Sequence, residues 1–291
     1  MTRATSPGPG LGQADFEKFR EYFYKRTGIQ FAGSKRYFVD KRIDACIRGA
    51  GFDSFLTWFA ALRLSDQPDL LQDVINQLTI NETYFLREDY QFDSMIKTVL
   101  PEVLAARGGA ARIDGPVKIL SLPCSTGEEP YSIALRLLEE WDQIDTVDVE
   151  IHGADIDSAV LDQARHGSYG ERSLQRVPKR WVTKYFAPVG AGRFQLDAEI
   201  RDVVTLHQMN VCDTAAMRRF REFDVVFCRN VLIYFDELSS RRAAENLYGA
   251  MRPGGYLFLG HSESMSRISP IFTPTRLPEG IVYQRPNTGA K

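Results

Sequence analysis

The strongest constraint on the fold is a change of pattern near residue 116. Before this point apolar residues recur at spacings of three and four, as they do in amphipathic helices, and no strand pattern is found. Beyond it, short apolar runs alternate with helical stretches, beginning with Val117–Leu122. Strands that alternate with helices are typical of a parallel sheet covered by helices on both faces. We therefore predict a small all-α domain followed by an α/β domain.

The part before residue 116 contains four predicted helices. Asp15 is predicted to cap the first, whose phenylalanines recur at helical spacing, and Gly28 is predicted to end it. The other three are predicted at Ser34–Arg48, Phe52–Leu64 and Asp69–Leu78. Residues 1–13 are rich in Pro and Gly and are predicted to be disordered. The expected all-α N-terminal domain covers residues 14–90.

The remaining residues, 91–291, are predicted to form one α/β domain with a Rossmann-like parallel sheet. The predicted strands are 117–122, 147–154, 224–228, 256–260 and 281–284, and the predicted helices are 130–141, 158–165 and 238–251. The alternation stops between Gly167 and Val204, where the chain is polar and apolar residues alternate. We expect a small antiparallel β-subdomain to be inserted there, at about residues 168–203.

Composition and charge exclude several classes of protein. Hydrophobic residues make up 44% and charged residues 25%, which are ordinary globular values. Lys and Arg total 36 against 38 Asp and Glu, so the basic excess of a nucleic-acid binder is missing. No apolar run is long enough to span a membrane, and the N-terminus lacks the apolar core of a signal peptide. We expect a cytoplasmic protein that is not inserted in a membrane.

Cysteine and histidine spacing gives no metal-site pattern. None of the four cysteines forms a CxxC pair, and the four histidines show neither HxxxH nor HExxH. Buried, reduced thiols are the expected state of the cysteines. No metal is predicted.

The loop after the first predicted strand reads LPCSTGEEPYS, Leu122–Ser132. It leads into a helix, as a nucleotide-binding loop does, but Gly127 is its single glycine and GxGxxG is absent. Glu128 and Glu129 would repel phosphates and suit a ligand with positive charge. An acidic helix start that merely complements the helix dipole is the alternative explanation.

Two further polar segments follow predicted strands. Asp155 ends the second strand, where an acidic residue commonly accepts hydrogen bonds from ribose hydroxyls, although a solvated turn aspartate is the alternative. Arg229, Asn230 and Tyr234 follow the strand DVVFC, where they could hold a carboxylate or an amine or could simply pack beside a helix. An adenosine-bearing, phosphate-free, partly cationic ligand suits all three segments. S-adenosylmethionine has that description, whereas NAD lacks its fingerprint.

Six ordered motifs closely resemble the chemotaxis receptor methyltransferases of the CheR type. They are NETYFLRE (81–88), STGEEPYS (125–132), DID (155–157), FCRNVLIYFD (227–236), PGG (253–255) and GHSE (260–263). The resemblance spans residues 15–285. It implies a helical N-terminal domain, a class I S-adenosylmethionine domain and an inserted β-subdomain. It also implies O-methylation of glutamate side chains on the cytoplasmic helices of bacterial chemoreceptors, which gives methyl esters in chemotactic adaptation.

The resemblance also assigns the site. It places the cofactor, and its product S-adenosylhomocysteine, against Asn81, Thr83, Arg87, Glu129, Asp155, Asn210, Val211, Cys228 and Arg229. Arg87 and Tyr234 are the implied catalytic residues, with Arg87 orienting the substrate carboxylate. The implied partner is the cytoplasmic domain of methyl-accepting chemoreceptors, and the enzyme is expected to be a monomer that binds no nucleic acid.

One departure from the family pattern concerns docking. Family members that bind a receptor's C-terminal pentapeptide have a longer Gly-containing loop in the β-subdomain, and Tyr185–Ile200 is shorter by about three residues. We therefore expect an enzyme that does not depend on the pentapeptide. The alternatives are a class I methyltransferase acting on another substrate, a non-catalytic S-adenosylmethionine-binding signalling module, and an NAD-dependent dehydrogenase.

Overall fold

The computed structural model describes residues 11–64 and 68–287 and divides into two compact units. One unit contains the described residues up to Ile80 together with Tyr234–Asp236, and the other contains Asn81–Ile233 and the chain from Glu237 onward. The division between the units falls between Ile80 and Asn81. The sequence pattern placed the end of the N-terminal domain later, at residue 90. Residues 1–10 of the segment predicted to be disordered lie outside the described part of the chain.

The first unit is helical, as predicted. Its helices are α1 (Gln13–Thr27), α2 (Arg36–Gly49), α3 (Phe55–Arg63) and α4 (Pro68–Leu78), with a 3-10 turn at Gly33–Lys35. Phe19 and Phe23 pack together because their spacing places them on one face of α1, and Phe19 also packs against Trp58 of α3; all three are fully buried. Gly28 ends α1 in a left-handed conformation, as expected. The prediction that Asp15 caps α1 is wrong, since Gly12 occupies that position and the helix starts at Gln13.

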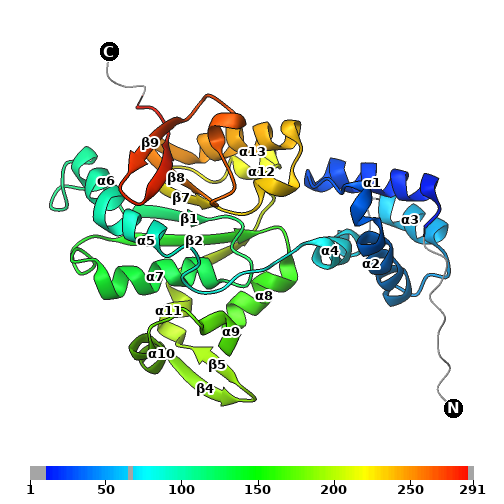
Figure 1. Ribbon diagram of the computed structural model, residues 1–291, viewed down its shortest axis with the longest axis horizontal. Coiled ribbons are helices and arrows are strands. Elements are labelled where there is room, and N and C mark those ends of the chain that lie inside the picture. The colour runs from blue at the N-terminus through cyan, green and yellow to red at the C-terminus, as the bar shows by residue number, and fades with distance from the viewer. Residues whose placement is uncertain (1–10, 65–67, 288–291) are drawn as a thin grey trace. The chain divides into compact units, whose positions relative to one another are not determined.

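The second unit is built on a seven-stranded sheet with the order β6-β2-β1-β7-β8-β10-β9 (Figure 1). The strands are β1 (Val117–Ser121), β2 (Val149–Asp155), β6 (Val204–Gln208), β7 (Phe223–Cys228), β8 (Met251–Leu259), β9 (Thr273–Leu277) and β10 (Gly280–Gln284). The first five in the sheet order are parallel, and β10 runs antiparallel to both β8 and β9. The order reverses at β1, so the carboxyl ends of β1, β2 and β7 flank a switch point where α/β sheets hold ligands.

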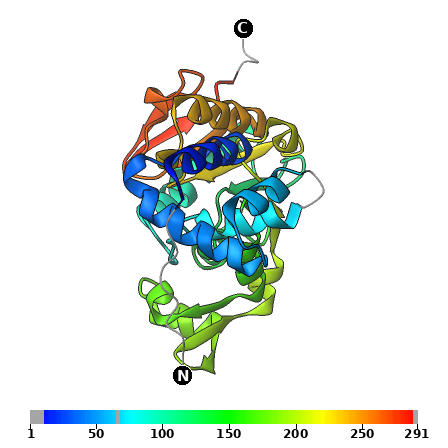
Figure 2. The ribbon, with the colours of Figure 1, turned by 90° about the vertical axis from the view of Figure 1, so that its right-hand side faces the viewer.

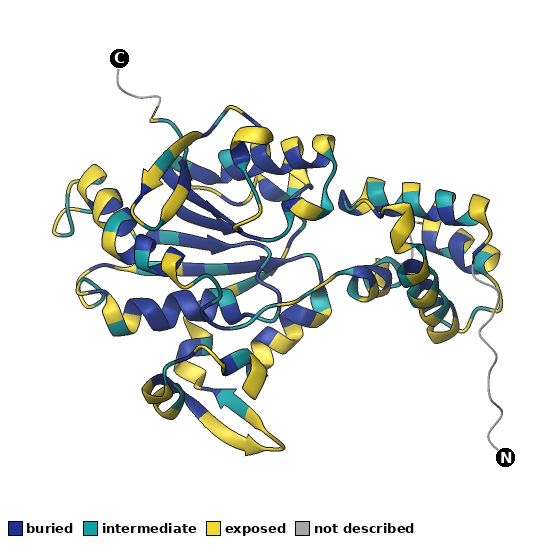
Figure 3. Ribbon diagram, viewed as in Figure 1, coloured by how far each residue is buried: buried dark blue, intermediate teal, exposed yellow. Residues whose placement is uncertain are grey.

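Helices cover both faces of this sheet. They are α5 (Tyr90–Ser94), a π-turn (Met95–Val99), α6 (Leu100–Ala106), α7 (Glu128–Glu140), α8 (Ser158–His166), α12 (Thr214–Met217), α13 (Glu237–Ala250) and a 3-10 turn (Met265–Arg267). Figure 1 shows α7 and α8 on one side of the sheet and α13 on the other. The central strands β1 and β7 and the inner faces of these helices are buried, which Figure 3 shows in dark blue, whereas the edge strands β6 and β9 are only partly buried.

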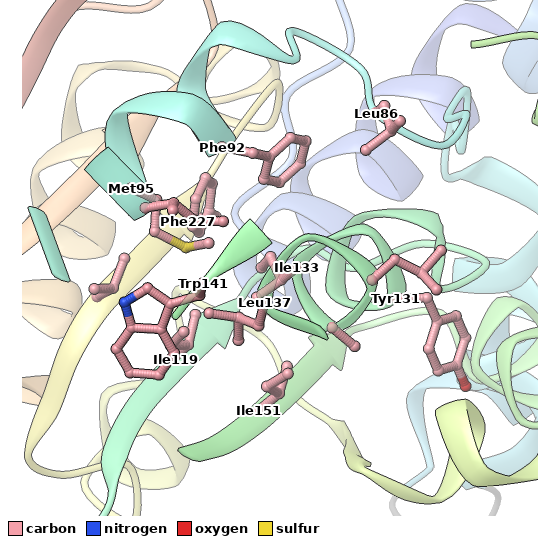
Figure 4. Packing of buried hydrophobic residues seen from close by; sticks show 14 of the residues in the cluster. Leu86, Phe92, Met95, Ile119, Tyr131, Ile133, Leu137, Trp141, Ile151 and Phe227 are labelled. Carbon is pink, nitrogen blue, oxygen red and sulfur yellow. The ribbon is translucent and has the colours of Figure 1, made fainter. Parts of the chain in front are cut away.

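The core between the sheet and α7 is apolar and continuous. Ile133 and Leu137 of α7 pack against Ile119 of β1 and Ile151 of β2 (Figure 4). Phe227 of β7 also belongs to this cluster and lies between two other aromatic rings. Its ring stacks on Phe92 at 5.6 Å and on Phe258 at 4.5 Å between ring centroids. This core holds the strand ends that carry the polar segments.

The predicted β-insert is confirmed. A three-stranded antiparallel sheet with the order β3-β5-β4 is formed by β3 (Ser168–Gly170), β4 (Phe186–Gly190) and β5 (Arg193–Leu196). Three short helices accompany it: α9 (Glu171–Leu174), α10 (Lys179–Tyr185) and α11 (Ala198–Asp202). In Figure 1 and Figure 2 the insert lies apart from the main sheet.

Candidate functional site

Gly127 sets the geometry of the loop after β1. It precedes α7 with φ of 94°, a left-handed conformation that favours glycine. A Cβ atom there would lie 2.6 Å from Cε2 of Tyr131 and 2.9 Å from Cβ of Ala164. The hydroxyl of Tyr131 donates to the Ala164 carbonyl at 2.9 Å. A side chain at position 127 would collide with Tyr131 of α7 and Ala164 of α8. The observed packing of α7 against α8 therefore requires glycine at this turn.

Asp155 ends β2 and is 2% exposed. Its Oδ2 accepts a hydrogen bond from the Ser125 amide at 2.8 Å, and its Oδ1 accepts one from the Asp157 amide at 3.0 Å. Burial raises the pKa of Asp155 to about 6, although both backbone donors favour the charged form. The carboxylate therefore joins the loop after β1 to the loop after β2, in addition to any contact with a ligand. The sequence did not indicate this supporting contact.

A buried ionic cluster lies where β7 ends. Glu129, in the first turn of α7, accepts from Ser121 Oγ at 2.7 Å, and its Oε2 lies 3.1 Å from Nη1 of Arg229. The Arg229 side chain is 2% exposed, and its Nη2 lies 3.4 Å from Oε2 of Glu88 and donates to the Arg87 carbonyl at 2.6 Å. Burial raises the pKa of Glu129, and the Arg229 guanidinium opposes that rise.

Residues 81–88 lie along the same edge of the sheet. Asn81 Nδ2 donates to Asp157 Oδ2 at 2.7 Å, and the Leu86 amide donates to Ser132 Oγ at 2.9 Å. Arg87 directs Nη1 to the Glu82 carbonyl at 2.9 Å. Thr83 is half-buried in this segment. The motif is thus held against the first turns of α7 and the N-cap of α8.

The remaining predicted residues lie on three other segments. Asn210 follows β6 and accepts from the Cys212 amide at 2.8 Å, and the carbonyl of the buried Val211 accepts from Asn246 Nδ2 at 2.7 Å. Cys228 is fully buried as the last residue of β7. Tyr234 belongs to the other compact unit, where its carbonyl accepts from the Gln30 amide at 3.1 Å.

The structure adds Glu88 and Asp157 to the predicted set. Glu88 contacts Arg229, and Asp157 accepts from Asn81 while capping α8. Both are acidic residues inside motifs already singled out by the sequence, NETYFLRE and DID. Their position in these motifs was the signal that could have identified them.

The polar groups at this edge are compatible with S-adenosylmethionine. The buried Asp155 and the half-buried Glu129 are carboxylates, which can accept hydrogen bonds from amino or hydroxyl groups and do not suit a phosphate. Nε of Arg229 is buried without a hydrogen-bond partner, so the cluster retains an unused donor. A single-glycine loop and an acidic edge at the switch point define a Rossmann-like S-adenosylmethionine-binding domain.

Comparisons with known proteins specify this class further. Residues 81–281 match the family model described as CheR methyltransferase, SAM binding domain, and residues 14–79 match CheR methyltransferase, all-alpha domain. The chain therefore belongs to the CheR methyltransferase family, and it is an S-adenosylmethionine-dependent methyltransferase.

Two curated relatives span nearly the whole chain. Chemotaxis protein methyltransferase 2 of Vibrio cholerae is 46% identical over 96% of this chain and 95% of its own length. Chemotaxis protein methyltransferase 1 of Pseudomonas aeruginosa is 32% identical, with 93% and 97% covered. Within residues 11–64 and 68–287, no helix is both long and apolar enough to cross a membrane.

Proposed function

We propose that this enzyme transfers the methyl group of S-adenosylmethionine to glutamate side chains on the cytoplasmic helices of chemoreceptors, forming methyl esters. The observation that carries the proposal is the buried Glu129–Arg229 cluster at the switch point, in a chain whose relatives are named chemotaxis methyltransferases. We propose that the reaction takes place in the cytoplasm, with a monomeric enzyme and without nucleic acid.

The proposed cofactor contacts follow from charge and position. Glu129 would hold the amino group of the methionine part, and Asp155 would accept from the ribose hydroxyls. The other proposed contacts are Asn81, Thr83, Arg87, Asn210, Val211, Cys228 and Arg229. When bound, S-adenosylmethionine supplies an electrophilic methyl group beside a positive sulfur.

The acceptor side chain needs placement rather than activation. A glutamate ionises near pH 4, so at neutral pH it is already a nucleophile and no general base is required. Arg87 would orient its carboxylate through two parallel donors, and Tyr234 would donate a hydrogen bond to the other oxygen or fix the methyl donor. The reaction joins an anion to a cation, so a site that excludes water favours it.

We further propose that methylation does not depend on a receptor's C-terminal pentapeptide. An added peptide strand needs an edge with unpaired amides and carbonyls. Strand β3 has three residues, and β4 carries Pro188 beside a register shift. Because proline lacks an N–H donor, neither edge of the insert offers a long run for pairing.

The test uses the full-length enzyme, a receptor cytoplasmic fragment and methyl-labelled S-adenosylmethionine. We expect label on the fragment that mild base releases as methanol, which distinguishes a carboxyl methyl ester from an N-methyl group. A fragment with glutamine at the acceptor positions is the control. Equal labelling with and without the receptor's last five residues would support independence from the pentapeptide. S-adenosylhomocysteine binding without any transfer would instead favour a non-catalytic signalling module.

Tyr234→Phe and Asp155→Ala are expected to affect different steps. Asp155→Ala should mainly weaken cofactor binding, because it removes the proposed ribose acceptor, whereas Tyr234→Phe should mainly lower turnover. Calorimetric titration with S-adenosylhomocysteine and initial rates on the receptor fragment separate the two effects. Equal losses of cofactor affinity in both variants would contradict this division.

Cofactor affinity is expected to depend on pH through Asp155. Its raised pKa, about 6, means that the carboxyl is mostly protonated at pH 5. Ribose donors favour the charged form, so binding should lower this pKa and release a proton. Affinity for S-adenosylhomocysteine should therefore rise about tenfold between pH 5 and pH 7, then level off. An equally steep profile in Asp155→Asn, measured by calorimetry, would assign the effect to another group.

A further inference from the structure

The GHSE turn follows β8 and has no role in the proposed cofactor contacts. Within it, the Glu263 carboxylate accepts three backbone hydrogen bonds. Oε2 accepts from the Asn230 amide at 2.7 Å and the Gly260 amide at 2.8 Å, and Oε1 accepts from the Leu232 amide at 2.8 Å. One side chain therefore satisfies donors from the two chain segments that leave neighbouring strands β7 and β8.

The backbone around this carboxylate has little freedom. Asn230 has φ of 60°, a left-handed conformation uncommon for a residue with a side chain. A Cβ atom on Gly260 would lie 2.6 Å from Nδ2 of Asn230 and 2.9 Å from Oε2 of Glu263. The three hydrogen bonds therefore hold a conformation that the chain would not favour alone.

Glu263 acts on Arg229 through the backbone. Arg229 lies between Cys228, the last residue of β7, and Asn230, whose amide the carboxylate binds. The direction in which the Arg229 side chain leaves the sheet depends on this backbone. That direction brings its guanidinium to 3.1 Å from Glu129.

A second connection reaches the other terminal nitrogen of the guanidinium, Nη2, through side chains. The GHSE turn presents His261, whose Nδ1 lies 2.9 Å from Oε1 of Glu88. Oε2 of Glu88 lies 3.4 Å from Nη2 of Arg229 and accepts from Gln91 Nε2 at 3.2 Å. Gln91 Nε2 also donates to the Leu259 carbonyl at 2.8 Å, so Glu88 is tied to the end of β8.

We propose that Glu263 is a positioning residue for methyl transfer, which acts by fixing the Arg229–Leu232 backbone so that the Arg229 guanidinium meets Glu129. The proposal rests on the cofactor site given under the proposed function. In this proposal Glu263 contacts neither substrate nor cofactor, and it acts by orienting Arg229, a proposed cofactor contact.

Glu263→Gln is the decisive substitution because it keeps the size of the side chain. Glutamine has one acceptor oxygen, and its NH2 group would face a backbone N–H donor. The matched control is Glu279→Gln, since Glu279 accepts from Ser94 Oγ at 3.0 Å in the turn between β9 and β10. We expect Glu263→Gln to weaken S-adenosylhomocysteine binding about tenfold and to lower kcat, while Glu279→Gln changes neither.

A merely structural role would give a different result. It would lower Tm while leaving the cofactor Kd and kcat unchanged at temperatures well below the transition, and that outcome would overturn the proposal. Arg229→Lys distinguishes failure of the proposed cofactor site from failure of the positioning role of Glu263. If Arg229→Lys weakens cofactor binding and Glu263→Gln does not, the positioning role is wrong. If neither variant does, the proposed cofactor site is wrong.

A measurement on the unaltered protein covers the case in which Glu263→Gln fails to fold. Amide hydrogen exchange should be slow at Asn230 and Leu232, because their N–H groups are bound by the carboxylate. Exchange at these two positions as fast as at an unstructured loop amide would show that the carboxylate does not hold the backbone, and would overturn the inference.

Discussion

Replacing Arg229 with methionine is expected to reduce stability by about 3 kcal/mol and to weaken S-adenosylhomocysteine binding by about a hundredfold. Its guanidinium lies between the carboxylates of Glu129 and Glu88, at 3.1 Å and 3.4 Å, and is almost fully buried. Methionine fills similar space without charge, so both carboxylates would remain without their cation. Removal of one partner from a buried ionic cluster is far more costly than loss of an exposed pair.

The loss of stability in Arg229→Met should also depend on pH. Burial already raises the pKa of Glu129, and without Arg229 that pKa should rise further. In the folded variant Glu129 then keeps its proton up to a higher pH than in the unfolded chain. The loss of unfolding free energy should therefore be smallest at acidic pH and grow as the pH rises. Denaturant unfolding near pH 5.5 and pH 7.5 measures this difference.

The matched control is Arg241→Met. Arg241 pairs with Glu237 at 2.6 Å on α13, but its side chain is 60% exposed. Loss of this pair should change stability by about 0.5 kcal/mol or less. Equal destabilisation in the two variants would mean that the buried cluster contributes nothing beyond an ordinary surface pair.

Gly127→Ala is expected to destabilise the protein by about 3 kcal/mol or more, because two penalties coincide. The residue has φ of 94°, and the new methyl group would lie inside the contact distance of Tyr131 and Ala164. The start of α7 would have to move, and Glu129 would move with it. Cofactor affinity should therefore fall together with stability.

Gly109→Ala separates these two penalties. Gly109 has φ of 87°, but a Cβ atom there would meet nothing within 4 Å. It should show the conformational penalty alone, about 1 kcal/mol, with unchanged cofactor affinity. Equal effects of the two substitutions, measured by thermal unfolding and calorimetry, would show that the close approach of α7 to α8 is unimportant.

The fold could be predicted where burial imposes a regular period. The apolar runs of β1, β2 and β7 identified the central strands, and the phenylalanines of α1 identified the first helix. The insert was found because polar residues and glycines interrupted the alternation. Strands β1 and β7 bury nearly every residue and α1 buries one face, so their sequences carry the pattern.

The sequence pattern did not reveal strands at the edges of the sheet or helices in which the spacing of apolar residues changes. Strand β6 lies at the edge of the sheet and its burial is mixed, so VTLHQ carries only two apolar residues, Val204 and Leu206, and no continuous apolar run. Strand β9, with Pro274 and Arg276, lies at the other edge. Helices α5 and α6 are joined by a π-turn, which shifts the spacing of their apolar residues.

The sequence motifs indicated Glu129, Asp155 and Arg229 as candidate site residues, but they did not indicate the contacts that these side chains make. The contact of Asp155 Oδ1 with the Asp157 amide is local, but the contact of its Oδ2 with the Ser125 amide depends on how two loops meet, which no local pattern encodes. The same holds for Glu263, whose three donors come from two separate segments.

The buried cysteines have a consequence for chemical labelling. Burial raises the pKa of Cys124 and Cys228 well above the ordinary value, and that of the half-buried Cys46 to about 11, while Cys212 is also buried. Since the thiolate is the form that attacks maleimides and disulfides, these native thiols should react slowly at neutral pH. A cysteine introduced on the surface could then carry a fluorophore without removal of the native four, which makes the enzyme suited to single-site spectroscopic studies of cofactor and receptor binding.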